Sequence, residues 1–495
     1  MLGEYVPTAR TALAALRTAT AESRYHVVGD PAVRSTINSA LAHYKLGGPE
    51  FPMEETEALL SIATRHLSEN SCVAPLAVGA PTAKRLGDLS YYAWVWCDER
   101  DEDLPAQTFR RLFYKQEVGR SALWTPNDDA HKMLANGTRL LTELLPELAR
   151  SALNHVHLVV LLHIADRTLW NDDRYRLPFD SFSTGIIPGT IFLSRAALKD
   201  VWHVAEYLLH EALHQKHHDL EHTHSMLRRG YSAADSPRTR ALWNRCHSYS
   251  SNEWPVCRAV AAFHVYVHLA LFFKGLDCRA PELEGRYGSL NGFNPALAAR
   301  RAVDRAHYLG QRIKEVDYEL GFAGQRFVDW LLEALAALGP HPEASDPIIH
   351  LLDLYDAELE EIKMLIASSS RATKGTHSLQ VTDNRKQTAR DTALDLIRTE
   401  LTMAHEVSSL LGSAPPQQCP NGDAYYSMVK TLSQRTDVEL ASIFEAARTY
   451  VYSSLRMLSP GILSSPCQSE PAKSIGHLLQ ETIDYSGNYL TVFSY

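Results

Sequence analysis

The stretch Y-L-L-H-E-A-L-H, residues 207 to 214, places His210 and His214 four positions apart with Glu211 beside the first. In an α-helix, side chains at positions i and i+4 lie on one face about one turn apart, so two imidazoles can reach the same metal ion. The neighbouring carboxylate points into the same cleft at a different angle. This H-E-x-x-H pattern predicts a metal-binding helix, and another part of the chain must supply the third ligand.

The residues around the motif predict a helix with one buried face. Apolar side chains recur at helical spacing at Leu198, Val201, Trp202, Ala205, Leu208, Leu209, Ala212 and Leu213. Residues 189 to 193 predict a short strand directly before the helix, and Ser194 is suited to cap its N-terminus. We expect the helix to run to Arg229 and to end at Gly230.

A second, almost wholly apolar helix is predicted from Arg258 to Phe273. Such a helix should be buried, and a buried histidine needs a partner because an unpaired imidazole carries a desolvation cost. His264 and His268 are therefore both candidates for the third ligand. Glu253, which precedes this helix, is a carboxylate alternative.

The rest of the chain is mostly helical, so we predict a mainly α protein, an α-rich α+β fold. Its domains would be a helical N-terminal region over residues 1–150, a catalytic metal-binding domain over 151–340 and a helical C-terminal region over 341–495. A Ser-rich linker is expected near 368–378. The apolar run 155–164 fits a strand and a buried helix equally well.

Downstream of the second helix, residues 276–295 are predicted as a loop, followed by helices over 295–316 and 324–338. Two more amphipathic helices are predicted over 388–411 and 424–458. The C-terminal region carries no chemical motif, so we expect it to pack, to bind a partner or to form a homodimer.

Composition narrows the class of protein. The 495 residues are enough for two or three domains, and 49 Lys and Arg against 58 Asp and Glu give a net charge of −9, which argues against nucleic-acid binding. The seven cysteines are odd in number, scattered and without a C-x-x-C pair, as in a reduced cytoplasmic protein. No secretory signal is evident, and no stretch approaches the roughly 18 uninterrupted apolar residues of a membrane helix.

The third ligand decides the chemistry. If it is Glu253 or another carboxylate, the site suits a zinc peptidase or amidase in which Glu211 takes a proton from zinc-bound water. If it is His264, three imidazoles and open positions suit iron(II) with a chelating cosubstrate and O2. The same three histidines also suit an all-histidine zinc hydrolase. A non-catalytic scaffold that holds a structural metal is a third reading.

Four segments together resemble the H-E-x-x-H-type peptide β-hydroxylases. They are P-G-T-I-F-L-S from Pro188, L-L-H-E-A-L-H from Leu208, W-P-V-C-R-A-V-A-A-F-H-V-Y from Trp254 and R-A-H-Y-L-G-Q-R from Arg305. The similarity covers residues 180 to 338. These enzymes depend on 2-oxoglutarate and iron(II) and act on peptides or related amino-acid substrates in natural-product pathways.

The resemblance implies that His210, His214 and His264 hold iron(II), with His268 as the competing third ligand. Glu211, beside the ligands, would then orient them or accept a proton, in place of acting as a peptidase base.

The resemblance also implies that Arg258 binds a carboxylate of 2-oxoglutarate, a task that Arg suits through bidentate pairing. Arg301 and Arg305 are alternative anchors. We therefore expect a non-haem iron(II), 2-oxoglutarate-dependent oxygenase that uses O2 to hydroxylate an amino-acid residue, a peptide or a carrier-bound small substrate. A zinc metallopeptidase or amidase is the alternative.

Overall fold

A computed structural model of the chain describes residues 7–46, 53–71, 74, 76–78, 84–87, 93–97, 103–115, 122–163, 180–241, 243, 253–290 and 292–339. The chain divides into two compact units, Met1–Pro237 with Pro255–His341, and Arg238–Trp254 with Pro342–Tyr495. The predicted N-terminal region and metal-binding domain thus belong almost entirely to the first unit. The predicted linker and the two C-terminal helices lie outside the described residues.

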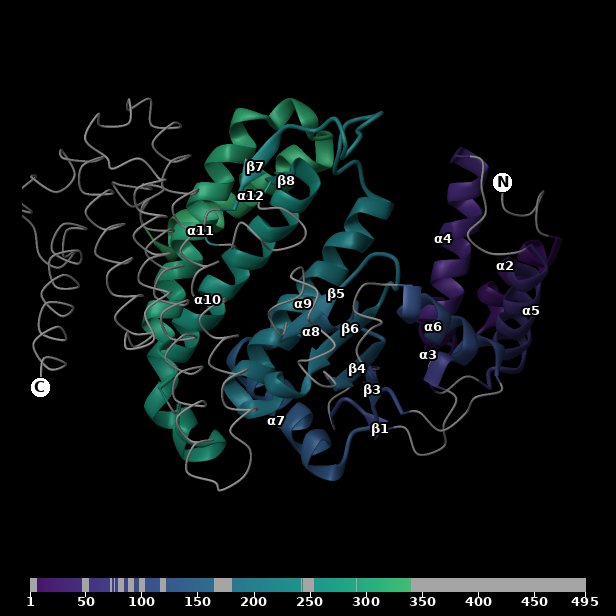
Figure 1. The fold of residues 1–495 in the computed structure, drawn as a ribbon, viewed down its shortest axis with the longest axis horizontal. Coiled ribbons are helices and arrows are strands. Elements are labelled where there is room, and N and C mark those ends of the chain that lie inside the picture. Colours follow the sequence, from purple (N-terminus) through teal and green to yellow (C-terminus); the bar gives the residue numbers. More distant parts are fainter. Residues whose placement is uncertain are drawn as a thin grey trace, which may run out of the picture. The chain divides into compact units, whose positions relative to one another are not determined.

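Helices dominate the described chain, and a small mixed sheet accompanies them (Figure 1). This agrees with the mainly α fold that the helical spacing of apolar residues predicted. The α-helices are α2 Pro7–Thr18, α3 Ala21–Gly29, α4 Pro31–Leu46, α5 Met53–Glu69, α6 Leu104–Lys115, α7 Asp128–Leu144, α8 Pro146–Leu153, α9 Val201–Thr223, α10 Val256–Tyr287, α11 Pro295–Glu315 and α12 Phe322–Leu338. Short 3-10 helices are η1 Leu76–Val78, η4 Arg195–Lys199 and η5 Asp317–Glu319. The strands are β1 Lys84–Arg85, β2 Trp94–Val95, β3 Ala122–Trp124, β4 Leu158–His163, β5 Ser181–Ser183, β6 Thr190–Ser194, β7 Arg238–Arg240 and β8 Glu253–Pro255.

The sheet of the first unit has the strand order β1-β2-β4-β6-β5, and β3 also pairs with β4. Strands β2, β4 and β6 are parallel, whereas β1, β3 and β5 are antiparallel to their neighbours. In the central pair, Leu158 lies opposite Thr190 and Leu162 opposite Ser194. Both strands are covered on both faces, which explains why the ambiguous run 155–164 contains a strand that is apolar without alternation.

Helices cover the two faces of this sheet. On one face, aromatic and aliphatic residues of α6 pack with alternate residues of β4 and with β6. This cluster includes Phe109, Leu112, Phe113, Leu158, Val160, Leu162 and Phe192. Helix α9 packs against β5 and β6, and against α7 and α8. The motif helix is therefore a core element.

The start and the end of the motif helix differ from the prediction. The strand before it is present as β6, but Ser194 caps η4, and Asp200 caps α9 by accepting a hydrogen bond of 2.9 Å from the backbone N–H of His203. The helix ends at Thr223 rather than Arg229, because the next residue has extended backbone angles. Because the chain breaks between η4 and α9, a second N-cap residue, Asp200, is needed. The apolar spacing runs on across this break, so it does not predict the second cap.

Helix α10 is longer than predicted. Residues 276–287 continue the helix in place of the expected loop, and Pro281 lies inside it. A proline removes one backbone hydrogen bond and usually ends or kinks a helix. Tertiary contacts outweigh that loss here, because Leu283 is fully buried and the Arg279 guanidinium donates to the backbone oxygen and the carboxylate of Glu143 on α7.

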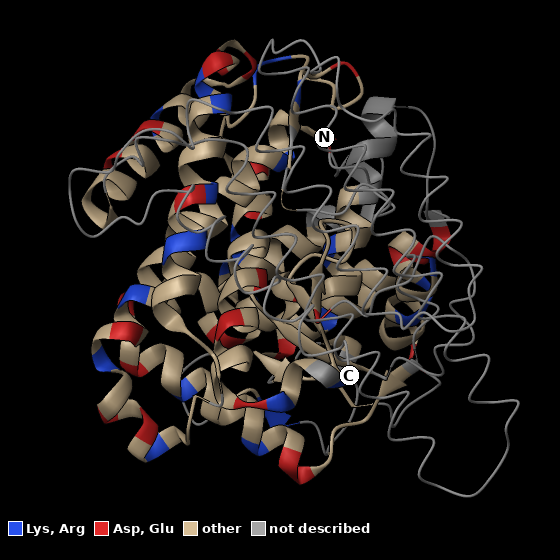
Figure 2. Ribbon diagram, turned by 60° about the vertical axis from the view of Figure 1, so that its left-hand side comes forward, with Lys and Arg blue, Asp and Glu red and all other residues tan. Residues whose placement is uncertain are grey.

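Helices α10, α11 and α12 pack against one another, and α10 also packs against α9. Among the described helices, α10 is long and apolar enough to cross a membrane, but 78% of its apolar stretch is buried inside the protein. Helix α10 is therefore a core helix, packed among α9, α11 and α12. Acidic and basic residues lie interleaved along the described helices (Figure 2).

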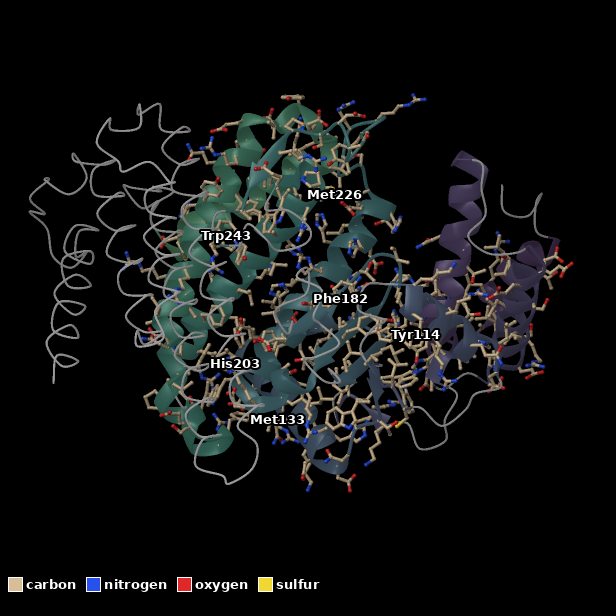
Figure 3. The ribbon with its side chains drawn as sticks, in the orientation of Figure 1. Tyr114, Met133, Phe182, His203, Met226 and Trp243 are labelled. Carbon is tan, nitrogen blue, oxygen red and sulfur yellow. The ribbon has the colours of Figure 1, made fainter. Side chains whose placement is uncertain are left out.

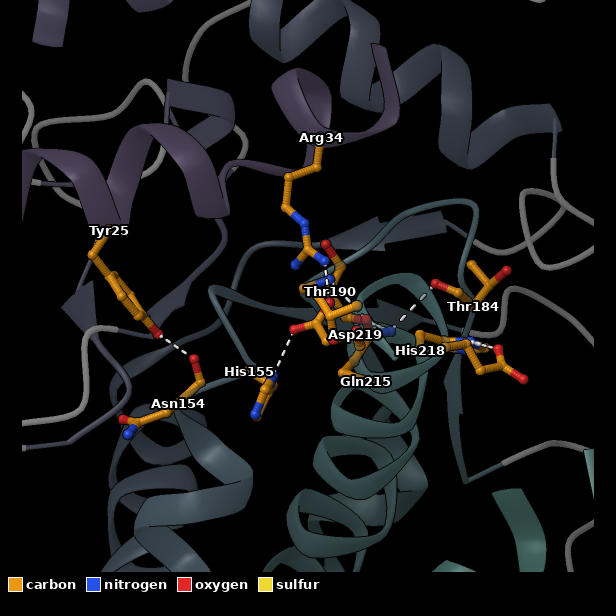
Figure 4. A network of polar contacts seen from close by, with 12 residues as sticks. Tyr25, Arg34, Asn154, His155, Thr184, Thr190, Gln215, His218 and Asp219 are labelled. Carbon is orange, nitrogen blue, oxygen red and sulfur yellow. Dashed lines mark hydrogen bonds and ion pairs between the residues drawn. The ribbon is translucent and has the colours of Figure 1, made fainter. Parts of the chain in front are cut away.

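Polar side chains of the N-terminal helices contact the C-terminal half of α9 and the end of α8 (Figure 4). Arg34 of α4 forms an ion pair with Asp219, whose other oxygen lies 2.6 Å from Nδ1 of His155. The hydroxyl of Tyr25 donates to the backbone oxygen of Asn154 at 3.0 Å. The contacts of Arg34 and His155 with Asp219 fix the C-terminal half of α9, and the Tyr25 bond joins α3 to the end of α8.

Gln215, directly after the second motif histidine, joins α9 to the sheet. Its side chain is 1% exposed. The amide oxygen accepts from the N–H of Gly189 at 2.7 Å, and the amide nitrogen donates to the backbone oxygens of Thr190 and Thr184 at 3.0 and 3.3 Å. Gly189 has φ +72°, and a Cβ there would lie 2.7 Å from His157, so glycine is required at this junction.

We predict that Gln215→Ala lowers the free energy of unfolding by about 3 kcal/mol, because it leaves two buried backbone groups and one part-buried group without their partner. Urea denaturation of the full chain followed by circular dichroism measures this change. Gln325→Ala, on the exposed surface of α12, is the matched control and should cost less than about 0.5 kcal/mol. Equal losses for the two variants would contradict the proposed role of Gln215.

Candidate active site

The two motif histidines face each other on α9. Nε2 of His210 and Nε2 of His214 are 3.2 Å apart, and their ring centroids are 5.0 Å apart. Two nitrogens bound about 2.1 Å from one ion lie about 3.0 to 3.4 Å apart at octahedral to tetrahedral angles. The pair therefore fits two adjacent positions around a metal ion.

The environment of His214 keeps its imidazole neutral. Burial, followed by the charges of His210 and other nearby cationic groups including Arg258, lowers the pKa of His214 well below its ordinary value. A neutral imidazole has a lone pair free for a metal, so no proton competes with the ion near neutral pH.

Glu211 points to the sheet side of the helix and is held there. It is 3% exposed, and one of its oxygens accepts a hydrogen bond of 2.6 Å from the hydroxyl of Ser181 on β5. The same carboxylate oxygen lies 3.9 Å from Nε2 of His210. Asp180, directly before Ser181, accepts a 2.8 Å hydrogen bond from the hydroxyl of Tyr207. Glu211 is thus a fixed acceptor beside the histidine pair.

His264, the predicted third ligand, lies in a buried histidine cluster between α9 and α10. It is 1% exposed, and its ring centroid is 6.0 Å from that of His217 and 4.6 Å from that of His268. Neither ring nitrogen of His264 has a hydrogen-bond partner among the described residues. The other candidate, His268, donates from Nδ1 to the backbone oxygen of His264 at 2.7 Å. This bond orients the ring and leaves the Nε2 lone pair for a metal, so His268 stays a candidate ligand.

Within the described ranges, no group of three or more His, Cys, Asp or Glu side chains is close enough to hold a metal ion. The histidine pair fits the ion, and His264 as the third ligand stays a prediction. Glu253 belongs to the second compact unit. Of the histidines that follow the motif, His217 is buried at 2% exposure, whereas His222 and His224 are exposed.

A cavity of about 540 Å³ adjoins His210, between α9, α10 and α11. His203, Glu206 and His210 line it from successive turns of α9, since residues three and four apart share one helix face. Arg301 and Arg305 line it from α11. The candidate metal position therefore opens onto a cavity with charged walls.

Two of the three predicted anchors for a cosubstrate carboxylate line this cavity, and the third does not. Arg301 and Arg305 line it, whereas Arg258, in the first turn of α10, is not among its lining residues. The guanidinium of Arg305 lies 5.5 Å from the ring centroid of Tyr266, which also lines the cavity. Such a cation–π contact orients the guanidinium at the wall.

Glu206 was not among the predicted site residues. Burial raises the pKa of its carboxyl to about 7, to which the nearby carboxylates Asp180 and Asp200 add, while Lys199 and Arg305 oppose the rise. No hydrogen bond or ion pair joins Glu206 to another described residue. Its position one turn before His210 is the sequence signal that identifies it, because E-x-x-x-H places both side chains on one helix face.

His203, labelled in Figure 3, is a second residue that the motif does not include. Its Nδ1 lies 2.8 and 2.9 Å from the two carboxylate oxygens of Asp200, which also caps the helix. Its ring packs edge-on against Phe293 at 5.0 Å between centroids. The imidazole is therefore fixed in the cavity wall.

A scan against protein-family models and a search of curated proteins find no match to this chain.

We predict that the full chain binds one Co²⁺ ion through His210 and His214, which visible absorption titration of metal-depleted protein measures. His214→Ala should weaken binding by at least about tenfold, because it removes one of two preformed nitrogen donors. His222→Ala, on an exposed face of the same helix, is the matched control and should bind as the wild type does. Loss of affinity in both variants, or in neither, would argue against this site.

Proposed function

We propose that this protein is a non-haem iron(II), 2-oxoglutarate-dependent oxygenase that hydroxylates an amino-acid residue, a peptide or a related metabolite in natural-product biosynthesis. The observation that carries the proposal is the joining of a preformed histidine pair to a cavity whose opposite wall carries Arg301 and Arg305. A redox metal and an anionic cosubstrate need these two features side by side.

In this proposal His210, His214 and His264 hold the iron, in a helical core preceded by the strand β6. Bound iron(II) with 2-oxoglutarate supplies the O2-dependent oxidation that is typical of this enzyme class. The neutral state of His214 supports a ligand role. Leu269 and Phe273 contribute apolar surface to the cavity lining.

Arg305 is our proposed anchor for the distal carboxylate of 2-oxoglutarate. It shares the cavity with His210, and its contact with Tyr266 restricts the orientation of the guanidinium. Arg301, one helical turn away, adds a second positive charge to the same wall. Arg258 is exposed at the start of α10, and its charge acts on His214 from outside the cavity.

Glu211 is proposed as a positioning residue. Its hydrogen bond from Ser181 and its low exposure direct the carboxylate toward the sheet. A peptidase base needs a carboxylate that faces metal-bound water and the substrate. The observed contact thus favours support of the histidine pair over general-base catalysis.

The proposal includes the cellular setting that the sequence indicates. We place the protein in the cytoplasm, with a peptide, an amino acid or a carrier-bound small molecule as substrate and with neither nucleic acid nor membrane as partner. A helical C-terminal region for packing or homodimerisation completes the proposed architecture.

We predict that the protein loaded with iron(II) forms succinate from 2-oxoglutarate only when O2 is present, and that Arg305→Gln raises the KM for 2-oxoglutarate about tenfold with a smaller effect on kcat. Loss of one charge-assisted pair in the cavity is the physical reason. The control is Arg300→Gln, an exposed residue of the same helix. Absence of O2-dependent succinate from the iron-loaded wild type would overturn the proposed function.

Glu211→Gln separates the oxygenase from a zinc peptidase or amidase. Because an amide can still accept the Ser181 hydrogen bond, we predict that this variant keeps succinate formation within about tenfold of the wild type. In a hydrolase the same change would abolish peptide cleavage by zinc-loaded protein, since the base is lost. Succinate release and cleavage of a peptide library are measured on the same preparations.

A further inference from the structure

The cavity beside His210 has two chemically different ends. Helices α9 and α10 run antiparallel, because His217 contacts His264 at one end, while His203 contacts Phe293, which contacts Phe273 at 5.9 Å, at the other. His210 and His203 are seven residues apart, which is about 10 Å along a helix. A ligand that fills the cavity therefore extends from the metal position to an aromatic end.

The aromatic end is suited to an apolar side chain. Phe273 of α10 and Phe293, just before α11, form one wall, and Leu269 and Leu297 line the cavity next to them. Burial of an aliphatic or aromatic side chain among such residues contributes about 1.5–3 kcal/mol. Apolar contacts alone do not orient a ligand, so a polar group must set its direction.

Glu206 is the polar group between these ends. It lies one turn from His210 and one turn from His203 on the cavity face of α9, and no hydrogen bond or ion pair joins it to another described residue. A carboxylate in this position favours a ligand that donates hydrogen bonds and carries positive charge. Burial raises the pKa of this carboxyl, because the surroundings of Glu206 disfavour its charged form.

We propose that the cavity binds an apolar amino acid with a free ammonium group, either as a free amino acid or as the N-terminal residue of a peptide, with the ammonium on Glu206 and the side chain against Phe273 and Phe293. This names the substrate class of the proposed oxygenase and rests on that function for the reaction, although not for the binding. Arg301 lines the same cavity, and its positive charge is complementary to a carboxylate of the free amino acid or to the first carbonyl of a peptide.

Other ligand classes fit less well. A neutral apolar group placed against Glu206 would bury it without a partner, and an anionic group at that position would place two negative charges together. A site built around a buried polar group rejects analogues that lack the matching group more strongly than it rejects changes in apolar size. Glu206 thus acts as the specificity-determining residue for the amino group.

Calorimetric titration of the full-length chain with three probes tests the proposal. L-phenylalanine represents the free amino acid, L-phenylalaninamide represents a peptide N-terminus, and N-acetyl-L-phenylalaninamide lacks the ammonium group. We expect at least one free-amine probe to bind about tenfold or more tightly than the acetylated probe, because the latter cannot form the charged hydrogen bond. The free-amine probe that binds more tightly shows whether the ligand is a free amino acid or the N-terminal residue of a peptide.

Glu206→Gln should weaken binding of the preferred free-amine probe about tenfold and leave the acetylated probe within about twofold. Glu206→Asp, which keeps the charge, should restore part of the loss. The matched control is Glu147→Gln, an exposed residue of α8. The comparison of probes on the wild type decides the question even if the Gln variant does not fold.

Equal binding of acetylated and free-amine probes to the wild type would overturn the proposal, as would unchanged selectivity in a folded Glu206→Gln variant. Selective, Glu206-dependent binding without O2-dependent succinate formation would support this inference while overturning the oxygenase function. Succinate formation without selectivity for the amine would do the reverse.

Discussion

The buried amide of Gln215 is the contact on which the site depends. It follows His214 directly and pairs with three backbone groups from residues 184, 189 and 190. Because buried backbone groups need partners, this pairing sets both the height and the rotation of α9 against the sheet. With that rotation fixed, His210 is directed to the cavity between α9, α10 and α11.

The same rotation gives the motif helix two polar sides with different tasks. Glu211 is turned toward β5, where Ser181 donates to it, while Glu206 and His210 line the cavity. Separation of these groups keeps the motif carboxylate away from the ligand space and leaves Glu206 as the acidic residue of the cavity wall. The chemistry of the site therefore follows from the orientation of one helix as much as from its motif.

Local patterns predicted much of this fold. The strand β6, the helices α9, α11 and α12 and the burial of α10 follow from apolar periodicity, since short-range spacing decides which side chains share a face. The predictions fail where distant contacts decide. Asp200 rather than Ser194 caps α9, and α10 continues through Pro281 because Leu283 and Arg279 bind it to neighbouring helices. Strands of two or three residues, such as β1 and β2, are too short to show an alternating pattern.

The sequence by itself determined the histidine pair, because the separation of His210 and His214 by one helical turn is a property of the α-helix alone. Only the tertiary structure decided which charged residues share the cavity with that pair. Arg301 and Arg305 line the wall although they follow the motif by some ninety residues. Glu206, one turn from His210 in the same helix, has no hydrogen-bond partner in the described part of the chain. Long-range packing of α10 and α11 on α9 sets these neighbours, and no local spacing encodes it.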